Sequence, residues 1–398
     1  MRSALVVLCL ILASPATGFA QPESAARGPW DDAFDPTRRD AERLVRQGLL
    51  LLLLAEEQLG GRASPLAQAP YSQIDSALVR FERARQSMPD DPDLAFYTAT
   101  ALSSWERPGR DGGTEYRAED AIAAWHRLRA LDPDYMPARV ALALAQLHFR
   151  RLELRRAAAE YEISLDRSLP EATILMGRTY LPSPLERRLA LMYFEVDGAM
   201  VHGNLAEARM QLGELEAAVQ HYQAAIVGSE TPMSSALAGW GLALALHRGE
   251  DRERSLHAAS DAIDLDPLAA RPERDRVQRR WGAFAVLHDP AVFFEPAYEM
   301  FGYHAVGYEA FAARPGVDTR AALTNALASW RRFLAEGGTS SRFAAHARAQ
   351  VERLESEVDS LPDDDAPARP SAPDLRLLGS RPASRALRDA SARTWLPL

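Results

Sequence analysis

One short pattern recurs along this chain and constrains its fold more than any other feature. A small residue is followed four residues later by an aromatic residue, then by another small or apolar residue, and after a turn by proline. The first copy is Ala77, Phe81, Ala84 and Pro89. Because residues spaced by three or four positions share one face of an α-helix, each copy predicts a helix that ends before its proline.

Further copies of this signature follow, and they match more loosely toward the C-terminus. They are Ala121, Trp125, Leu128 and Pro133; Ala157, Tyr161, Ser164 and Pro170; Ala218, Tyr222 and Ala225; and Ala259, Ala262 and Pro267. Small residues let two helices approach closely, and the aromatic ring fills the space between them. The signature therefore predicts antiparallel helix pairs that stack into an extended array.

In these residues the chain resembles the tetratricopeptide repeat family, in which each repeat is a helix pair of about 34 residues. The resemblance covers roughly residues 70 to 335. It implies an all-α fold: an α-solenoid of antiparallel helix pairs, wound as a right-handed superhelix. The distance from Phe81 to Trp125 exceeds the family's period, which fits an inserted loop at residues 107 to 117. The glycines of that loop could cradle an anion, but a flexible connection between two helices is the favoured interpretation.

The array is expected to be irregular in its second half. Between Pro170 and Ala199 the pattern is distorted, and we interpret that stretch as a degenerate copy. Residues 268 to 285 are rich in arginine and predict one long helix. A late helix pair should follow, with Tyr303 in its first helix and Trp330 in its second. The segment from 343 to 357 predicts a closing helix with charge on its outer face, as the end of a solenoid requires.

Composition divides the chain into five segments. We predict a signal peptide at 1–20, a poorly ordered segment at 21–37, the repeat array at 38–267, a C-terminal helical region with a degenerate repeat and a capping helix at 268–358, and a disordered tail at 359–398. The tail is rich in proline, aspartate and alanine, which disfavours a packed core.

The N-terminal segment predicts export to the periplasm, the cell envelope or the extracellular space. Arg2 supplies its positive end, an apolar stretch follows, and a small-x-small site precedes Gln21. This stretch is too short for a bilayer, which needs about 20 apolar residues. Cys9 is the single cysteine and lies within it, so the mature chain would have no disulfide and no cysteine-ligated metal. A second apolar run, Leu49 to Leu54, predicts a buried first helix and no membrane span.

Motifs for catalysis and for cofactor binding are absent from the sequence. It contains no G-x-S-x-G elbow, no H-E-x-x-H pair and no lysine for a phosphate-binding loop. No two of the 9 histidines are four residues apart. We therefore predict no catalytic residue, no metal site and no cofactor. A net charge of −9 argues against nucleic acid as a partner.

The binding surface is expected on the first helix of each pair, which lines the concave face in tetratricopeptide arrays. Projecting the repeat frame places seven side chains on that face: Phe96, Val140, Leu144, Met200, Met210, Trp240 and Leu244. They predict a largely apolar groove that suits an amphipathic helix or an extended apolar peptide. An equally weighted interpretation is that some of them are core residues between repeats. Without lysine, the carboxylate clamp of some family members is not expected.

One further stretch is dense in aromatic residues. It contains Phe293, Phe294, Tyr298, Phe301, Tyr303 and Tyr308. Core packing is the favoured interpretation, and a platform for a ligand or peptide is the alternative.

Together these features predict a non-catalytic protein–protein interaction scaffold in the bacterial cell envelope. Its partner would be a protein segment, either a peptide or a helix, bound in the concave groove. The alternatives are a periplasmic protein that binds a small ligand or solute, and an enzyme whose site has no recognised motif. The pattern identifies neither the partner nor the oligomeric state.

Overall fold

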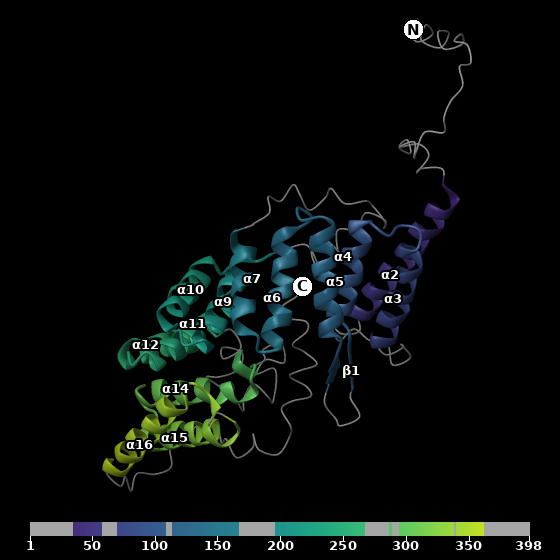
Figure 1. Ribbon diagram of the computed structural model, residues 1–398. Coiled ribbons are helices and arrows are strands. Elements are labelled where there is room, and N and C mark those ends of the chain that lie inside the picture. Colours follow the sequence, from purple (N-terminus) through teal and green to yellow (C-terminus); the bar gives the residue numbers. More distant parts are fainter. Residues whose placement is uncertain are drawn as a thin grey trace, which may run out of the picture.

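The predicted all-α architecture is confirmed. The computed structural model describes residues 35–57, 70–108, 114–166, 196–266, 286–288, 294–337 and 340–361. Over these ranges the chain is an array of helices that lie side by side in sequence order, with α2 at one end and α16 at the other (Figure 1). The predicted signal peptide and the predicted arginine-rich helix lie outside the described residues. The predicted degenerate copy also lies outside them, except for its last few residues. So does all but the beginning of the predicted tail.

The helices form pairs in chain order, and each pair packs on the next. The pairs are α2 (Pro36–Glu57) with α3 (Pro70–Arg85), α4 (Pro92–Ser103) with α5 (Ala118–Leu131), α6 (Pro137–Arg150) with α7 (Leu154–Asp166), α9 (Gly198–Gln211) with α10 (Leu215–Gly228), α11 (Pro232–Arg248) with α12 (Arg252–Leu265), and α14 (Met300–Ala312) with α15 (Thr319–Ala335). The closing helix α16 (Ala344–Ser360) packs on α15. In each case the second helix of a pair contacts the first helix of the following pair.

Proline and short polar side chains set where several first helices begin. Pro92, Pro137 and Pro232 occupy the first positions of α4, α6 and α11. Proline suits this position because its fixed φ fits a helix and the first N–H groups have no partner within the helix. The side chain of Asp91 accepts a hydrogen bond from the backbone N–H of Leu94 at 3.0 Å, which caps α4.

The signature residues lie in the core, as predicted. Each aromatic of the well-matched copies, and Trp330 of the late pair, is almost completely buried on the second helix of its pair. These residues are Phe81, Trp125, Tyr161, Tyr222 and Trp330. The alanine four positions before each of them has no exposed surface. The small residue and the aromatic residue of each copy therefore lie in the contact between neighbouring helices.

Two glycines make room for these rings. A Cβ atom at Gly48 of α2 would lie 2.4 Å from the ring of Phe81, and one at Gly241 of α11 would lie 2.1 Å from the ring of Tyr222. Both distances are far shorter than a van der Waals contact. The backbone of the first helix therefore lies directly against the aromatic ring at these points.

The inserted loop between α4 and α5 contains strands that the sequence analysis does not predict. β1 (Glu106–Pro108) pairs antiparallel with β2 (Thr114–Tyr116), with Arg107 opposite Glu115. An ion pair joins the side chains of these two residues. The insertion thus lies where predicted, but its flanks form a short hairpin.

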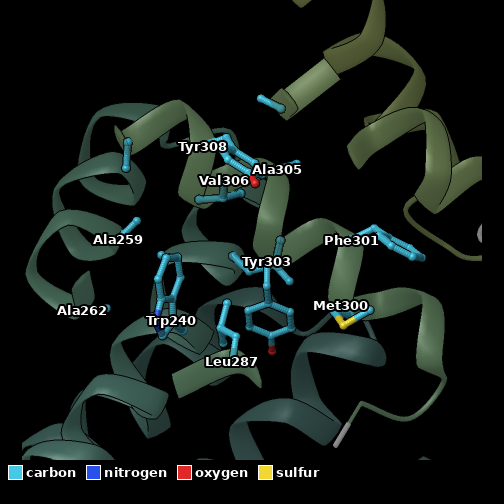
Figure 2. Packing of buried hydrophobic residues seen from close by; sticks show 14 of the residues in the cluster. Trp240, Ala259, Ala262, Leu287, Met300, Phe301, Tyr303, Ala305, Val306 and Tyr308 are labelled. Carbon is cyan, nitrogen blue, oxygen red and sulfur yellow. The ribbon is translucent and has the colours of Figure 1, made fainter. Parts of the chain in front are cut away.

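The largest hydrophobic cluster extends from α9 to α16, from Ala206 to Leu354. It is continuous across the predicted domain boundary at 267/268, so the described core does not separate there. In Figure 2, Trp240 of α11, Leu287 of the short helix η4 (Val286–His288) and Tyr303 of α14 converge within this cluster. The C-terminal half therefore packs as one body of side chains.

Helix α14 lies at the centre of this cluster. All of its residues except Phe311 are buried, so it is covered on every side. Phe301, Tyr303 and Tyr308 belong to it, and their burial matches the favoured interpretation of the aromatic stretch as core. Phe294 and Tyr298 are half-buried, and Phe293 lies outside the described residues.

The leucine-rich run in α2 is only partly buried. Leu49, Leu52 and Leu53 face the core, whereas Leu50 and Leu54 are exposed. Among the described helices, none combines the length and the apolar character that crossing a bilayer requires.

Candidate functional site

The structure places six of the seven predicted groove residues in the core. Phe96, Val140, Leu144, Met210, Trp240 and Leu244 are buried, and Met200 is half-buried. The ring of Phe96 meets that of Trp125 edge-on, with centroids 5.4 Å apart. Such burial favours the interpretation of these residues as core between repeats, because a partner could reach them only after the helices separate.

Other side chains of the same first helices remain accessible. Those that are half-buried include Thr98 on α4, Gln146 on α6, Met200 and Glu207 on α9, and Leu242 on α11. An α-helix turns by about 100° per residue, so an error of one or two positions in the frame moves a side chain to another face. The sequence signature identifies these helices, but it does not specify which of their faces is accessible.

A buried polar network crosses the C-terminal half, and its first part centres on Glu207 of α9. The hydroxyls of Tyr222 and Tyr303 each donate to the Oε2 atom of Glu207 at 2.6 Å. The amide of Gln211, one turn further along α9, donates to Oε1 of Glu207 at 2.9 Å and to the backbone carbonyl of Glu295 at 2.7 Å. Burial, and then the charge of Glu207, raises the pKa of both tyrosines well above the ordinary value, so both remain protonated donors.

A buried ion pair forms the second part of the network. Arg248 of α11 donates to the carboxylate of Glu299, which belongs to the short helix η5 (Ala297–Glu299). The guanidinium also lies over the ring of Phe343, 3.9 Å from its centroid. Burial raises the pKa of Glu299, and the charge of Arg248 only partly opposes this effect. The pair joins α11 to the segment that precedes α14.

The third part of the network surrounds Glu309 of α14, whose side chain is completely buried. Its carboxylate lies 3.4 Å from Nε2 of His247, 3.1 Å from Nε of Arg252 and 2.5 Å from a terminal nitrogen of Arg353. Burial alone would raise the pKa of Glu309. The contact with His247 and the positive charges around the carboxylate outweigh burial and hold the pKa of Glu309 at about 2. Glu309 thereby links helices α11, α12, α14 and α16.

Two histidines complete this part of the network. Nδ1 of His247 lies 2.9 Å from Nε2 of His346, and the ring of Trp330 stacks on His247 with centroids 5.5 Å apart. Burial, with the nearby charges of His247 and Arg248, lowers the pKa of His346 to about 3. His346 is therefore neutral at ordinary pH and accepts or donates one hydrogen bond within the core.

The network joins helices, and its groups are buried apart from those at its edges, such as the half-buried Glu207 and His346. His247, Arg248, Glu299 and Glu309 are buried, and each has a partner on another element. Within the described ranges, no three histidine, cysteine or acidic side chains are arranged to hold a metal ion. Strongly displaced pKa values in clefts often mark catalytic sites, but structural ion-pair networks produce them too. Here the enclosed geometry fits the structural role.

Sequence reasoning singled out Tyr222 and Tyr303 for their rings, but it missed the charged and histidine members of this network and the network itself. Its residues come from α9 to α16 and have no regular spacing, so no local pattern connects them. A partial signal existed in α14, where His304 and Glu309 interrupt an otherwise apolar helix. A charged residue in such a helix needs a partner, because burying an unpaired charge is costly.

Comparison with known proteins gives distant likenesses. No protein-family model matches the chain, and no curated protein matches it. Matching solved structures include the MamA protein, with 14% identity and a TM-score of 0.37, covering 57% of this chain and 97% of that one. The tetratricopeptide domain of P58(IPK) matches with 13% identity and a TM-score of 0.21, covering 79% of this chain and 99% of that one.

The assignment of the fold rests on the chain's own contacts. Consecutive helices pair, each pair packs on the next, and the small–aromatic signature fills the core between them. The fold is a tetratricopeptide-like α-solenoid. In such an array each repeat contacts its neighbours, and the first helices of successive pairs together form one extended surface.

Proposed function

We propose that this chain is a non-catalytic interaction scaffold of the bacterial cell envelope, which binds a peptide or helix of a partner protein along its first helices. The observation that supports this most is the stacked array of helix pairs, which presents side chains from many repeats along one surface. The buried polar network supports it as well, because its ionised groups hold helices together inside the core.

The accessible side chains of the first helices suggest the chemistry of the partner. Thr98, Gln146, Met200 and Leu242 are uncharged, and two of them are polar. Glu207 is acidic, but its carboxylate already accepts from Tyr222 and Tyr303. Such a surface favours a segment of low charge, whose backbone groups can bond to the hydroxyl and the amide while its apolar side chains contact Met200 and Leu242. A clamp that holds an acidic peptide through lysine is not possible, because the chain contains no lysine.

Export is the second part of the proposal. It is supported by the positive end, the apolar stretch and the small-x-small site that precede Gln21. The measurement is the mass of the protein recovered from a periplasmic fraction. Cleavage predicts a mature chain that begins at Gln21, whereas an uncleaved chain confined to the cytoplasm would contradict export.

Position-specific crosslinking tests the binding surface without disturbing the core. A photo-reactive amino acid is placed at Thr98, Gln146 or Met200 in separate variants, and cells are irradiated. The control positions are Val79 and Val227, which are 58% and 88% exposed and lie on second helices. We expect one and the same protein to be crosslinked from the three first-helix positions and not from the controls.

Two outcomes would contradict the proposal. One is the absence of any crosslinked protein at the three first-helix positions. The other is the same set of products from test and control positions, which would indicate nonspecific collisions. Thermal melts of each variant should match the unsubstituted protein, because all five positions retain access to solvent.

A further inference from the structure

The two terminal helices of the array leave faces that no described helix covers. At one end, α2 packs on α3 and α4; at the other, α16 packs on α15 (Figure 1). Repeat arrays normally carry polar outer faces at both ends, since an apolar end exposes surface that the next repeat would bury. The two described ends of this array differ in their exposed apolar side chains: α2 exposes Leu50 and Leu54, whereas α16 exposes no large apolar side chain.

The outer face of α2 changes character along the helix. Exposed arginines occupy positions 39, 43 and 46 of its first half, and Asp40, also exposed, pairs with Arg43 at 3.1 Å. In the second half, Leu50 and Leu54 are 43% and 48% exposed. Spacings of three and four place the three arginines and two leucines along one stripe. This stripe runs from positively charged to apolar.

The outer face of α16 changes in the opposite sense. Ala345 and Ala349 are exposed in its first half, where their small side chains allow another helix to approach closely. Acidic residues follow at Glu352, Glu355 and Asp359, of which the first and last are exposed. Glu355 is half-buried and pairs with Arg331 of α15 at 2.6 Å. The exposed Arg348 lies beside the two alanines. The stripe of α16 therefore runs from small side chains with one arginine to negatively charged ones.

We propose that α2 of one molecule packs antiparallel on α16 of a second copy of this chain. In that orientation Leu54 and Leu50 lie against Ala345 and Ala349, which buries apolar surface on both helices. The three arginines of α2 then lie along the three acidic residues of α16.

Charge disfavours the other arrangements of two copies. A symmetric contact of α2 with α2 in antiparallel orientation sets the arginines of each helix against the leucines of its partner. A parallel contact sets arginine against arginine, and like charges in direct contact repel. The head-to-tail contact is the one that matches both charge and polarity. It uses two different surfaces, so it generates open chains or rings, not closed dimers.

Such a contact should be weak and dependent on concentration. A single helix-on-helix contact falls below the roughly 1,200 Å² at which stable interfaces begin. Its exposed charges are screened by salt. We therefore expect assembly at high protein concentration and low ionic strength, and dissociation on dilution or on addition of salt.

Sedimentation equilibrium of the purified chain across the micromolar to millimolar range measures this assembly. The weight-average mass should rise with concentration beyond twice the mass of one chain. Replacing both exposed leucines, Leu50→Glu with Leu54→Glu, should keep the protein monomeric. Val227→Glu is the control, because it places the same charge on an exposed residue away from both ends and should leave assembly unchanged.

A charge exchange separates loss of the contact from loss of folding. One variant carries Arg43→Glu and Arg46→Glu, and the other carries Glu352→Arg and Asp359→Arg. Each variant alone should remain monomeric, because its two ends now have the same charge. Mixing the two should restore assembly, since each end then meets its opposite.

Three results would overturn the proposal. The first is a monomer at every concentration of the unsubstituted chain. The second is a mass that reaches a plateau at twice the monomer. The third is failure of the mixed variants to assemble although circular dichroism shows that both are folded.

Discussion

Replacing Glu309 by glutamine tests the role of the buried network most directly. The substitution keeps the size of the side chain but removes the charge that faces His247, Arg252 and Arg353. The neutral amide can satisfy only part of this environment, and its NH₂ group would point a donor at other donors. We expect Glu309→Gln to destabilise the packing of α14 against α11 and α16.

The pKa of Glu309 gives the magnitude. The folded chain holds it at about 2, against an ordinary value of 4.5. At about 1.4 kcal/mol per pKa unit, this difference corresponds to about 3 kcal/mol of stability. Because the pKa is lower in the folded state, the contribution is complete above pH 4.5 and is lost as the pH falls from 4.5 toward 2.

Urea unfolding followed by tryptophan fluorescence measures the effect, because Trp330 lies beside His247 and His346. Near neutral pH the free energy of unfolding should be lower for Glu309→Gln than for the unsubstituted chain, by about 3 kcal/mol. The difference should shrink as the pH falls from 4.5 toward 2. A difference that is absent at neutral pH, or that stays constant down to pH 3, would refute this account.

Glu357→Gln is the matched control. Glu357 pairs with the same Arg353 at 2.7 Å, but its side chain is 39% exposed. Exposed ion pairs contribute about 0 to 1 kcal/mol because water screens both charges. The control should therefore show a small effect with little dependence on pH. An equal loss from both variants would mean that burial of Glu309 is not what gives its ion pairs their strength.

The remaining predictions concern the aromatic positions, the buried His304 and the half-buried His346. Trp125→Ala should cost about 3 to 5 kcal/mol in urea unfolding, because the ring is completely buried between helices. Gly241→Ala should cost about 1 to 3 kcal/mol by overpacking. Most of that cost should disappear in a Tyr222→Ala background, since the added Cβ meets that ring. Burial lowers the pKa of His304 and His346 to about 3, so the unfolded chain takes up their protons first. Stability should therefore fall as the pH drops below 6.5, and less steeply in the His304→Gln, His346→Gln variant.

The fold could be predicted because its rule is local. A small residue, an aromatic and a second small residue at spacings of four and three fix one face of one helix, and Phe81, Trp125 and Tyr222 are all buried on that face. The proline that follows ends the helix for a reason that needs no tertiary information. Repetition then predicts the stacking, because a single helix pair cannot bury its own apolar face.

The binding face could not be predicted with the same precision. Phe96 and Val140 lie on the predicted helices but point into the core, whereas Thr98 and Gln146 on the same helices are accessible. Which face of a first helix is covered depends on the preceding and following pairs.

Helix geometry alone predicts that the leucine run of α2 is only partly buried. Six consecutive apolar residues cover more than the full circumference of a helix, which turns once every 3.6 residues. They cannot all face one neighbour unless the helix is surrounded. Among the described helices α2 is the first of the array and contacts α3 and α4, so exposure of Leu50 and Leu54 follows from its position.

In the C-terminal half, some contacts join helix pairs that are not adjacent in sequence, which distinguishes this half from a simple solenoid. Tyr303 of α14 donates to Glu207 of α9, although the pair α11 and α12 lies between them in sequence. In the N-terminal half, Arg129 of α5 pairs with Glu160 of α7, which belongs to the adjacent pair. When repeats contact only their neighbours, stability is a sum of local terms. The hydrogen bond from Tyr303 to Glu207 makes the stability of three helix pairs interdependent. The ion pairs of Glu309 extend this coupling to α16. The stripe on α16 is therefore held by the whole C-terminal core, whereas the stripe on α2 depends on the first two pairs alone.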